Sequence, residues 1–148
     1  MAARIYIGVG AIIEDDRGRV LLVKHVKERG GFWQGKWICP GGELEYGETI
    51  AEGIEREVKE ETQLDIELTE ALPAFDTVVK SNGKVDLHVI YIDYLARVTG
   101  GTLQVGTDIG ESLWIEKKRV NTVWYELHDD TKRLMEIGRI VRSGIRRS

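Results

Sequence analysis

The sequence has a single cysteine, no long apolar run and no excess of basic charge, and each shortage excludes a class of protein. The lone Cys39 excludes an internal disulfide and suits a reducing cytosol. No stretch of 18 uninterrupted apolar residues is present, and the N-terminus lacks the pattern of a signal peptide. A net charge of -4 argues against broad binding to nucleic-acid phosphates. We therefore expect a cytoplasmic protein with no nucleic-acid partner and no membrane partner.

A chain of 148 residues is long enough to bury a real core, and its length fits one domain spanning residues 1–148. Cys39 lies in the apolar run Trp37-Ile38-Cys39, and no histidine partner is evident in the sequence. We therefore interpret Cys39 as a packing residue rather than a nucleophile.

The most informative stretch, residues 40–64, is a glycine-rich turn followed by a helix crowded with glutamates. Thr49 and Glu52 have the spacing of a capping box, which predicts a helix that begins there and ends near Gln63. The apolar positions at helical spacing form one stripe, and they are Ile50, Ala51, Ile54 and Val58. This stripe predicts the face of the helix that packs on the core.

Three glutamates, Glu57, Glu60 and Glu61, are spaced to lie together along one edge of that stripe. Like charges repel there, and partial burial penalises their ionisation, so a positive group should neutralise them. Ligand sets made only of oxygen atoms suit hard cations such as Mg²⁺ or Mn²⁺. The alternative is an ordinary charged helix surface, which accounts well for the Glu55–Lys59 pair on the other side.

The same stretch resembles the signature box of the Nudix hydrolases, G-x5-E-x7-R-E-U-x-E-E-x-G-U, in which U is aliphatic. Gly42, Glu48, the run from Arg56 to Glu61 and Leu64 match it at the correct offsets. One position departs, because Gln63 stands where the box has its last glycine. A residue other than glycine in the left-handed conformation at the end of a helix destabilises the fold by about 1 kcal/mol, or the helix has to end in another conformation.

The resemblance implies hydrolysis of a pyrophosphate bond in a nucleoside diphosphate linked to another group, with Mg²⁺ or Mn²⁺ as cofactor. It implies that Glu57 and Glu61 ligate the metal directly, and Glu60 directly or through water. The backbone carbonyl of Gly41 is a further implied ligand.

Two more implied roles concern orientation and proton transfer. Arg56 resembles the arginine that pairs with box glutamates, here Glu48, and holds the cluster in place. The general base comes from the box or from a later loop, where Glu111 is our candidate, followed by Asp108.

Alternating or buried apolar runs predict strands elsewhere, at residues 4–13, 20–23, 37–40, 44–46, 65–68, 74–79, 85–98 and 112–115. Asn82-Gly83 predicts a hairpin turn. Asp129 or Asp130 should cap a second helix that Gly144 ends. This order cannot form a doubly wound parallel sheet and suits a mixed sheet between helices. It agrees with the α/β/α sandwich that the resemblance implies.

Substrate selectivity should come from the stretch at residues 29–37 and the strand bearing His88. Their candidate substrate contacts are Arg29, Trp33, Lys36 and His88, and Lys36 or Lys24 could meet phosphate charge. The alternative for His88 is a structural histidine within the sheet whose hydrogen bonds are all made by the protein. We expect a nucleoside triphosphate, cleaved to a monophosphate and pyrophosphate.

Two alternatives stay open. One is hydrolysis of ADP-ribose, although the proline that marks that class, about fifteen residues past the box, is replaced by Lys80. The other is a non-catalytic nucleotide-sensing module, against which the intact acids argue. Large aromatics in expected loops, Phe32, Trp33 and Trp124, also predict a homodimer.

Overall fold

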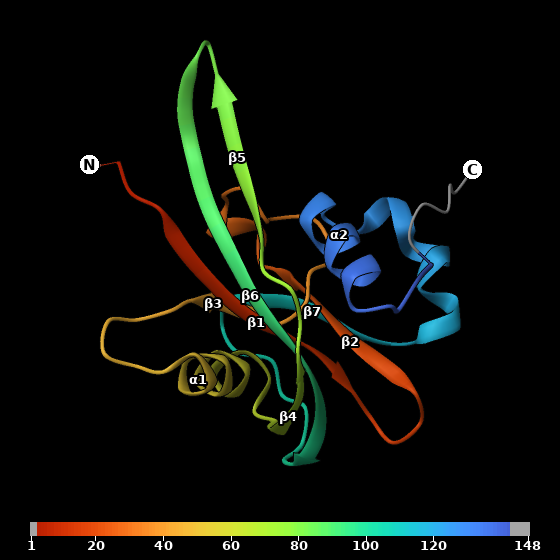
Figure 1. Ribbon diagram of the computed structural model, residues 1–148. Coiled ribbons are helices and arrows are strands. Elements are labelled where there is room, and N and C mark those ends of the chain that lie inside the picture. Colours follow the sequence, from red (N-terminus) through yellow and green to blue (C-terminus); the bar gives the residue numbers. More distant parts are fainter. Residues whose placement is uncertain (1–2, 143–148) are drawn as a thin grey trace.

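The computed structural model describes residues 3–142, and its centre is a seven-stranded mixed sheet with the strand order β4-β6-β1-β2-β7. The strands are β1 (Tyr6–Glu14), β2 (Arg19–His25), β3 (Gly41–Glu43), β4 (Asp65–Ala71), β5 (Phe75–Ser81), β6 (Lys84–Gly100) and β7 (Ile109–Glu116). Helix α1 (Ile50–Thr62) lies on one side of the sheet and α2 (Asp129–Ile137) on the other (Figure 1). The predicted fold class is confirmed. No helix in the described part of the chain is long and apolar enough to span a membrane.

Strand β6 is the longest strand and lies centrally in the sheet. It pairs in parallel with β1 from Val89 onward, and on its other edge it pairs first with β5 and then with β4. The β5–β6 turn uses Asn82 and Gly83, both at positive φ, which confirms the predicted hairpin. This hairpin extends well beyond the rest of the sheet (Figure 1).

Strands β1 and β2 meet at Glu14 and Val20 and then separate, because the chain between β2 and α1 inserts between them. Ile38 bridges to Val23, and β3 pairs with residues 8–10 of β1. The strand expected at residues 44–46 therefore lies earlier, at Gly41–Glu43. Glycine explains the shift, since a Cβ atom on Gly41 would lie only 2.4 Å from the carbonyl oxygen of Val9.

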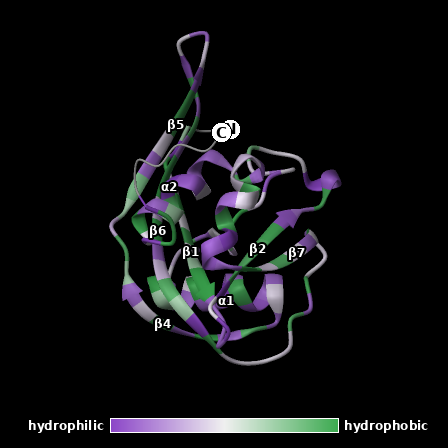
Figure 2. Ribbon diagram, turned by 90° about the vertical axis from the view of Figure 1, so that its right-hand side faces the viewer, coloured by the Kyte–Doolittle hydropathy of each residue, from purple (hydrophilic) through white to green (hydrophobic). Residues whose placement is uncertain are grey.

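Two hydrophobic cores fill the two sides of the sheet. The predicted stripe of α1 is confirmed at Ile54 and Val58, which are fully buried against the odd-numbered residues of β1, and at the partly buried Ile50. Ala51 was wrongly included, because it is exposed. Residues at even positions in the second half of β6, such as Ala96, join this core, whereas Leu95 packs into the core under α2. Apolar residues gather on the central strands (Figure 2). Alternation along β6 therefore decides which side of the sheet each side chain reaches.

The ends of α1 are as the sequence predicts. The Thr49 hydroxyl accepts a hydrogen bond from the Glu52 N–H, and the Glu52 side chain accepts one from the Thr49 N–H. Gln63 adopts the left-handed conformation that a glycine would favour, with φ 64° and ψ 13°. The departure from the signature box therefore leaves the helix exit unchanged.

Helix α2 differs from expectation at both ends. Its N-cap is His128, whose Nδ1 accepts a hydrogen bond from the Asp130 N–H, while both predicted caps lie in the first turn. The helix ends before Gly138, where a Cβ atom would meet Ile12 Cδ1 at 2.5 Å. The predicted stop, Gly144, lies outside the described residues. Two 3-10 segments, η1 (Lys27–Arg29) and η2 (Lys117–Glu126), were not predicted.

Candidate active site

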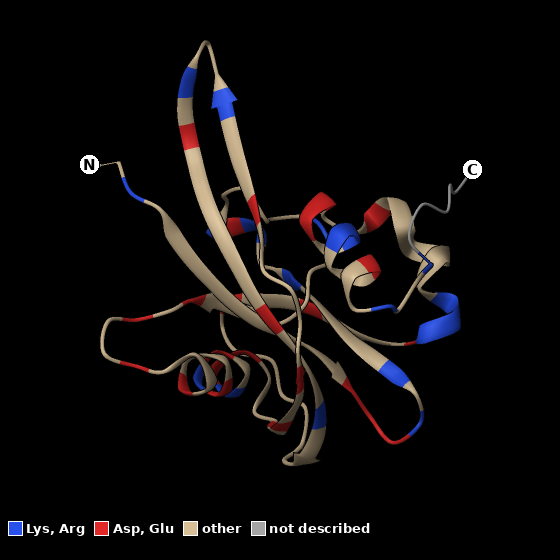
Figure 3. Cartoon of the chain, viewed as in Figure 1, with Lys and Arg blue, Asp and Glu red and all other residues tan. Residues whose placement is uncertain are grey.

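The glutamates of α1 meet the loop before β7 around a polar cavity of about 320 Å³, which we call the acidic cavity. Acidic residues are dense on α1 and in the loop before it (Figure 3). The cavity is lined by Arg29, Glu57, Glu60, Glu61 and residues 106–109. The three glutamates that the sequence grouped by helical spacing therefore share one concave surface.

Glu61 is the most buried acid of this cluster, with 6% of its surface exposed. Its Oε1 accepts a hydrogen bond of 2.9 Å from the Gly41 N–H, so the glycine turn and the helix are joined at this point. Burial raises the pKa of Glu61 to about 8, and the neighbouring Glu57 adds to the rise. Burial raises the pKa of Glu57 as well. Both carboxylates would be stabilised by a nearby cation.

Arg56 holds the acids of the box in a network. Its Nε and Nη2 donate to Glu48 at 2.9 and 2.7 Å, and its Nη1 donates to Glu57 at 2.8 Å and to Glu60 at 2.9 Å. The Arg56 hydrogen bonds lower the pKa of Glu48 to about 2. Glu48 is thus a fixed anion that orients the arginine, and the arginine fixes the acids of the cavity.

The residues fit a divalent cation in chemistry and in space. The donors are oxygen atoms, and a Cβ atom on Gly42 would fall within 2.3–2.7 Å of the Glu57 carboxyl group, so glycine makes room for that group. Among the described residues, no three His, Cys, Asp or Glu side chains are already arranged around one metal position. Glu57 and Glu60 instead pair with Arg56.

The loop before β7 brings Asp108, rather than Glu111, to the acidic cavity. Asp108 lines the cavity and lies 3.6 Å from Arg29 in an ion pair. Glu111 lies further along β7, opposite Lys24, and its side chain is exposed outside the cavity. The order of preference in the sequence therefore reverses.

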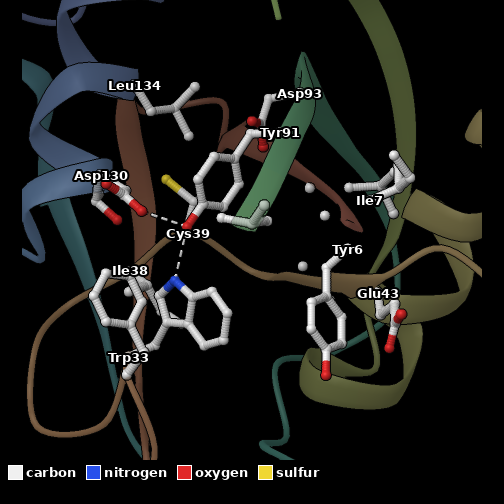
Figure 4. A pocket seen from close by; sticks show the side chains of 18 of the residues that line it. Tyr6, Ile7, Trp33, Ile38, Cys39, Glu43, Tyr91, Asp93, Asp130 and Leu134 are labelled. Atoms are coloured by element: carbon white, nitrogen blue, oxygen red, sulfur yellow. Dashed lines mark hydrogen bonds between the residues drawn. The ribbon is translucent and has the colours of Figure 1, made fainter. Parts of the chain in front are cut away.

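A second cavity of about 530 Å³, the aromatic cavity, opens between the sheet and α2 (Figure 4). Its aromatic lining residues are Tyr6, Phe32, Trp33, Phe75 and Tyr91. Arg29 lines this cavity as well as the acidic one, and His25 lies on its wall with Nε2 3.9 Å from Glu61. The two cavities therefore adjoin.

A chain of hydrogen bonds fixes one wall of the aromatic cavity. The Trp33 Nε1–H donates to the Tyr91 hydroxyl at 3.0 Å, and that hydroxyl donates to Asp130 Oδ2 (Figure 4). The Thr77 hydroxyl donates to the other oxygen of Asp130 at 2.8 Å. His128 Nε2 lies 3.2 Å from the Phe32 carbonyl, which ties the loop to α2. The indole of Trp33 is thus held in place.

Three basic residues proposed from sequence lie elsewhere. His88 lines neither cavity. Side chains alternate along β6, so Val89 and Tyr91 reach the aromatic cavity and His88 lies on the opposite side of the sheet. The Lys36 ammonium group points to the Tyr125 carbonyl, and the Lys24 ammonium group lies 4.5 Å from the ring centroid of Trp37. None of the three lines either cavity. Of the proposed substrate contacts, only Arg29 and Trp33 line the aromatic cavity.

Sequence reasoning missed Tyr91, Asp93 and Asp130, which line the aromatic cavity. The available signal was the alternation in β6, where residues 89, 91 and 93 fall on one side. We considered this strand only as the carrier of His88 and did not consider its other side.

The fold and the acidic helix define a class of protein, and comparison with known proteins gives the same one. The family model of the NUDIX domain matches residues 5–135. The chain therefore belongs to the Nudix hydrolases, and the predicted enzyme class, a pyrophosphohydrolase, is confirmed.

Individual relatives differ in their named substrates. The chain is 34% identical over 106 residues to an ADP-ribose pyrophosphatase of Methanocaldococcus jannaschii, a match that covers 72% of this chain and 59% of that protein. It is 26% identical to the nucleoside triphosphatase NudI of Escherichia coli, over 85% of this chain and 91% of the relative. A Nudix hydrolase structure from Nitrosomonas europaea superposes with a TM-score of 0.75 at 23% identity, covering 92% and 89% of the two chains, and shows the same fold.

Proposed function

We propose that this protein hydrolyses a nucleoside triphosphate between its α and β phosphates, releasing a nucleoside monophosphate and pyrophosphate. The observation that carries the proposal is the pair of adjoining cavities, one acidic and one aromatic, with Arg29 on the walls of both. An acidic cavity suits phosphates when divalent cations lie between the charges. An aromatic cavity of this volume suits a planar base.

In this proposal Glu57 and Glu61 hold a divalent metal ion, with Mg²⁺ favoured and Mn²⁺ as the alternative. Glu60 binds it directly or through water, and the Gly41 carbonyl completes the protein ligands. The bound ion would neutralise the diphosphate and make the attacking water more acidic. Arg56, which makes a bidentate contact with Glu48, would keep Glu57 and Glu60 oriented, because a carboxylate can accept a hydrogen bond through one oxygen and bind the ion through the other.

We assign Asp108 as the group that accepts the proton of the attacking water, in preference to Glu111. Its position on the wall of the acidic cavity supports this assignment. Arg29 lies between the two cavities, where its guanidinium group can meet the phosphates that leave as pyrophosphate. Trp33 provides a fixed aromatic surface for the base.

A second candidate substrate is ADP-ribose, and one observation favours it. The relative with 34% identity is named an ADP-ribose pyrophosphatase, although the match spans only 59% of its length. The absent proline marker and the fuller match with NudI favour the triphosphate.

The decisive assay compares catalytic efficiency on the common ribo- and deoxyribonucleoside triphosphates with that on ADP-ribose, in Mg²⁺, with products identified by chromatography. We expect monophosphate and pyrophosphate as the main products. Much faster conversion of ADP-ribose to AMP and ribose phosphate would reject the triphosphate.

A single domain, a cytoplasmic location and a homodimer stay predictions. The argument for the dimer now rests mainly on Phe32, which is 39% exposed, because Trp33 and Trp124 pack against the cores. Light scattering at micromolar concentration tests it, and a monomer alone would reject it.

A further inference from the structure

Two buried side-chain atoms in the described part of the chain lack a hydrogen-bond partner, and both belong to residues that line the aromatic cavity. They are Asp93 Oδ2 and His25 Nε2. Leaving a buried polar atom unpaired destabilises a protein by about 1–3 kcal/mol, so each such atom calls for an explanation. His25 lies beside Glu61 and belongs to the acidic cluster. Asp93 does not belong to that cluster, because no residue that lines the acidic cavity lies in β6.

The fold makes a specific place for the Asp93 carboxyl group. Asp93 lies opposite Gly10 in the parallel pairing of β6 with β1. A Cβ atom on Gly10 would lie 2.9 Å from Asp93 Oδ1 and 2.8 Å from the Pro40 carbonyl oxygen. Glycine therefore leaves the space that the carboxyl group fills, at a position where alternation would otherwise favour an aliphatic residue.

The carboxyl group of Asp93 is well suited to donate a hydrogen bond. Only 6% of the residue is exposed, and burial raises its pKa to about 7, so much of it is protonated near neutral pH. The titratable groups that interact with it are the Cys39 thiol and the Tyr91 hydroxyl. Burial raises the pKa of each, and both stay uncharged.

The other two aspartates that line the cavity, Asp86 and Asp130, do not offer the same group. Asp86 is exposed and accepts a hydrogen bond from the Ser81 hydroxyl at 2.6 Å. Asp130 is fully paired. Its two carboxylate oxygens accept hydrogen bonds from the hydroxyls of Thr77 and Tyr91. It therefore fixes Tyr91, whereas Asp93 keeps one oxygen for a ligand. Figure 4 shows Asp93 and Tyr91 on the same strand, two positions apart and therefore on the same side.

We propose that Asp93 is a specificity-determining residue, whose carboxyl group donates a hydrogen bond to a ring nitrogen or carbonyl oxygen on the edge of the bound nucleobase. The proposal rests on the proposed function in taking the aromatic cavity as the site of the base. A ligand without an acceptor at that edge leaves the carboxyl group unpaired and binds less tightly. Asp93 acts on binding of the base and not on the bond that is cleaved.

The test measures binding separately from hydrolysis. Affinities for AMP, GMP, CMP and UMP are determined by calorimetry without metal, for the wild type, Asp93→Leu and Asp93→Asn. Asp93→Leu should lower the affinity for the preferred monophosphate about 10-fold to 100-fold. It should also reduce the differences in affinity among the four monophosphates. Asp93→Asn keeps an N–H donor and should stay within about threefold of the wild type. Asp76→Leu, on β5 and outside the cavity lining, is the matched control.

Ribose 5-phosphate, which has no base, separates recognition of the base from a general effect on the site. An equal loss for this ligand and for the nucleotides would mean that Asp93 only supports the Pro40–Gly41 turn, and would overturn the proposal. Unchanged affinity and base preference in Asp93→Leu would overturn it too. If ADP-ribose proves to be the substrate, the triphosphate proposal fails, while these binding measurements still decide the role of Asp93.

Should Asp93→Leu fail to fold, the wild type and Asp93→Asn decide together. Wild-type affinity for the preferred monophosphate should fall relative to that of Asp93→Asn as the pH rises from about 6 to about 8, because the carboxyl group loses its proton. A constant ratio of the two affinities across this range would overturn the proposal.

Discussion

The acidic cavity and the aromatic cavity adjoin, yet they are built in opposite ways. The glutamates of the first come from little more than one turn of α1, and the arginine that orients them comes from the same helix. The second collects side chains from β1, the loop after β2, β5, β6 and α2. Under the proposed function, chemistry that acts on any diphosphate is concentrated in one short segment, whereas recognition of the rest of the substrate is spread over the chain. Changes in the two cavities should therefore affect different kinetic constants.

The largest effect should come from the acidic cavity. Glu57→Gln and Glu61→Gln should each lower kcat about 100-fold to 1,000-fold, because each removes a charge needed to hold the metal. The fold should persist, which circular dichroism can check. Glu55→Gln, on the exposed side of the same helix, is the control and should stay within about twofold. Near wild-type turnover in either variant at saturating Mg²⁺ would refute the metal assignment.

The stability of the metal-free protein should also depend on pH. Burial raises the pKa of Glu61 to about 8 from 4.5, so its neutral form favours folding, and metal-free stability should fall as pH rises across this window. His25, with its pKa lowered by burial to about 4, opposes this below about pH 6.5, so the fall should be clearest above that pH. Asp93 contributes to the fall as well, up to its pKa of about 7.

Because the metal binds ionised Glu61, affinity for Mg²⁺ should rise about tenfold between about pH 6.5 and pH 8.5. Melting temperatures measured with and without Mg²⁺ at each pH give the result. Glu61→Gln should show little of this dependence. A Mg²⁺ shift of the same size in the variant and the wild type would place the cation elsewhere.

A change in the aromatic cavity should act on binding instead. Trp33→Ala removes the aromatic surface for the base and should raise KM about tenfold while kcat changes little, since stacking contributes about 1–3 kcal/mol per base. Trp33→Phe keeps a ring and should recover most of the affinity. Steady-state kinetics on the preferred nucleotide measure both constants. A loss confined to kcat would contradict the division between the two cavities.

The smallest effect concerns stability alone. Gln63→Gly relieves the left-handed conformation at the end of α1 and should stabilise the protein by about 0.5–1 kcal/mol, a rise of roughly 2–4 °C in Tm. Activity should be unchanged, because the exit of the helix already has the required shape. A lower Tm would show that the Gln63 side chain makes a stabilising contribution.

The same division explains what could be predicted from the sequence. Helical spacing placed Glu57, Glu60 and Glu61 together because neighbours in a helix are neighbours in space. No comparable rule links Trp33 to Tyr91 and Asp130, which meet only after the sheet has formed. His88 was misplaced because period-two alternation puts adjacent residues on opposite sides of the sheet. The N-cap of α2 was missed because it is a histidine, whereas N-cap residues are usually Ser, Thr, Asp or Asn.

The Arg56 network has a consequence for how the protein is made. In small domains with structural zinc, the ligands repel or lack partners until the ion arrives, so folding waits for metal. Here the guanidinium group of Arg56 already pairs with Glu48, Glu57 and Glu60. If a divalent ion binds as proposed, we expect the chain to reach its native structure without that ion. A chelator should then abolish activity without unfolding the protein.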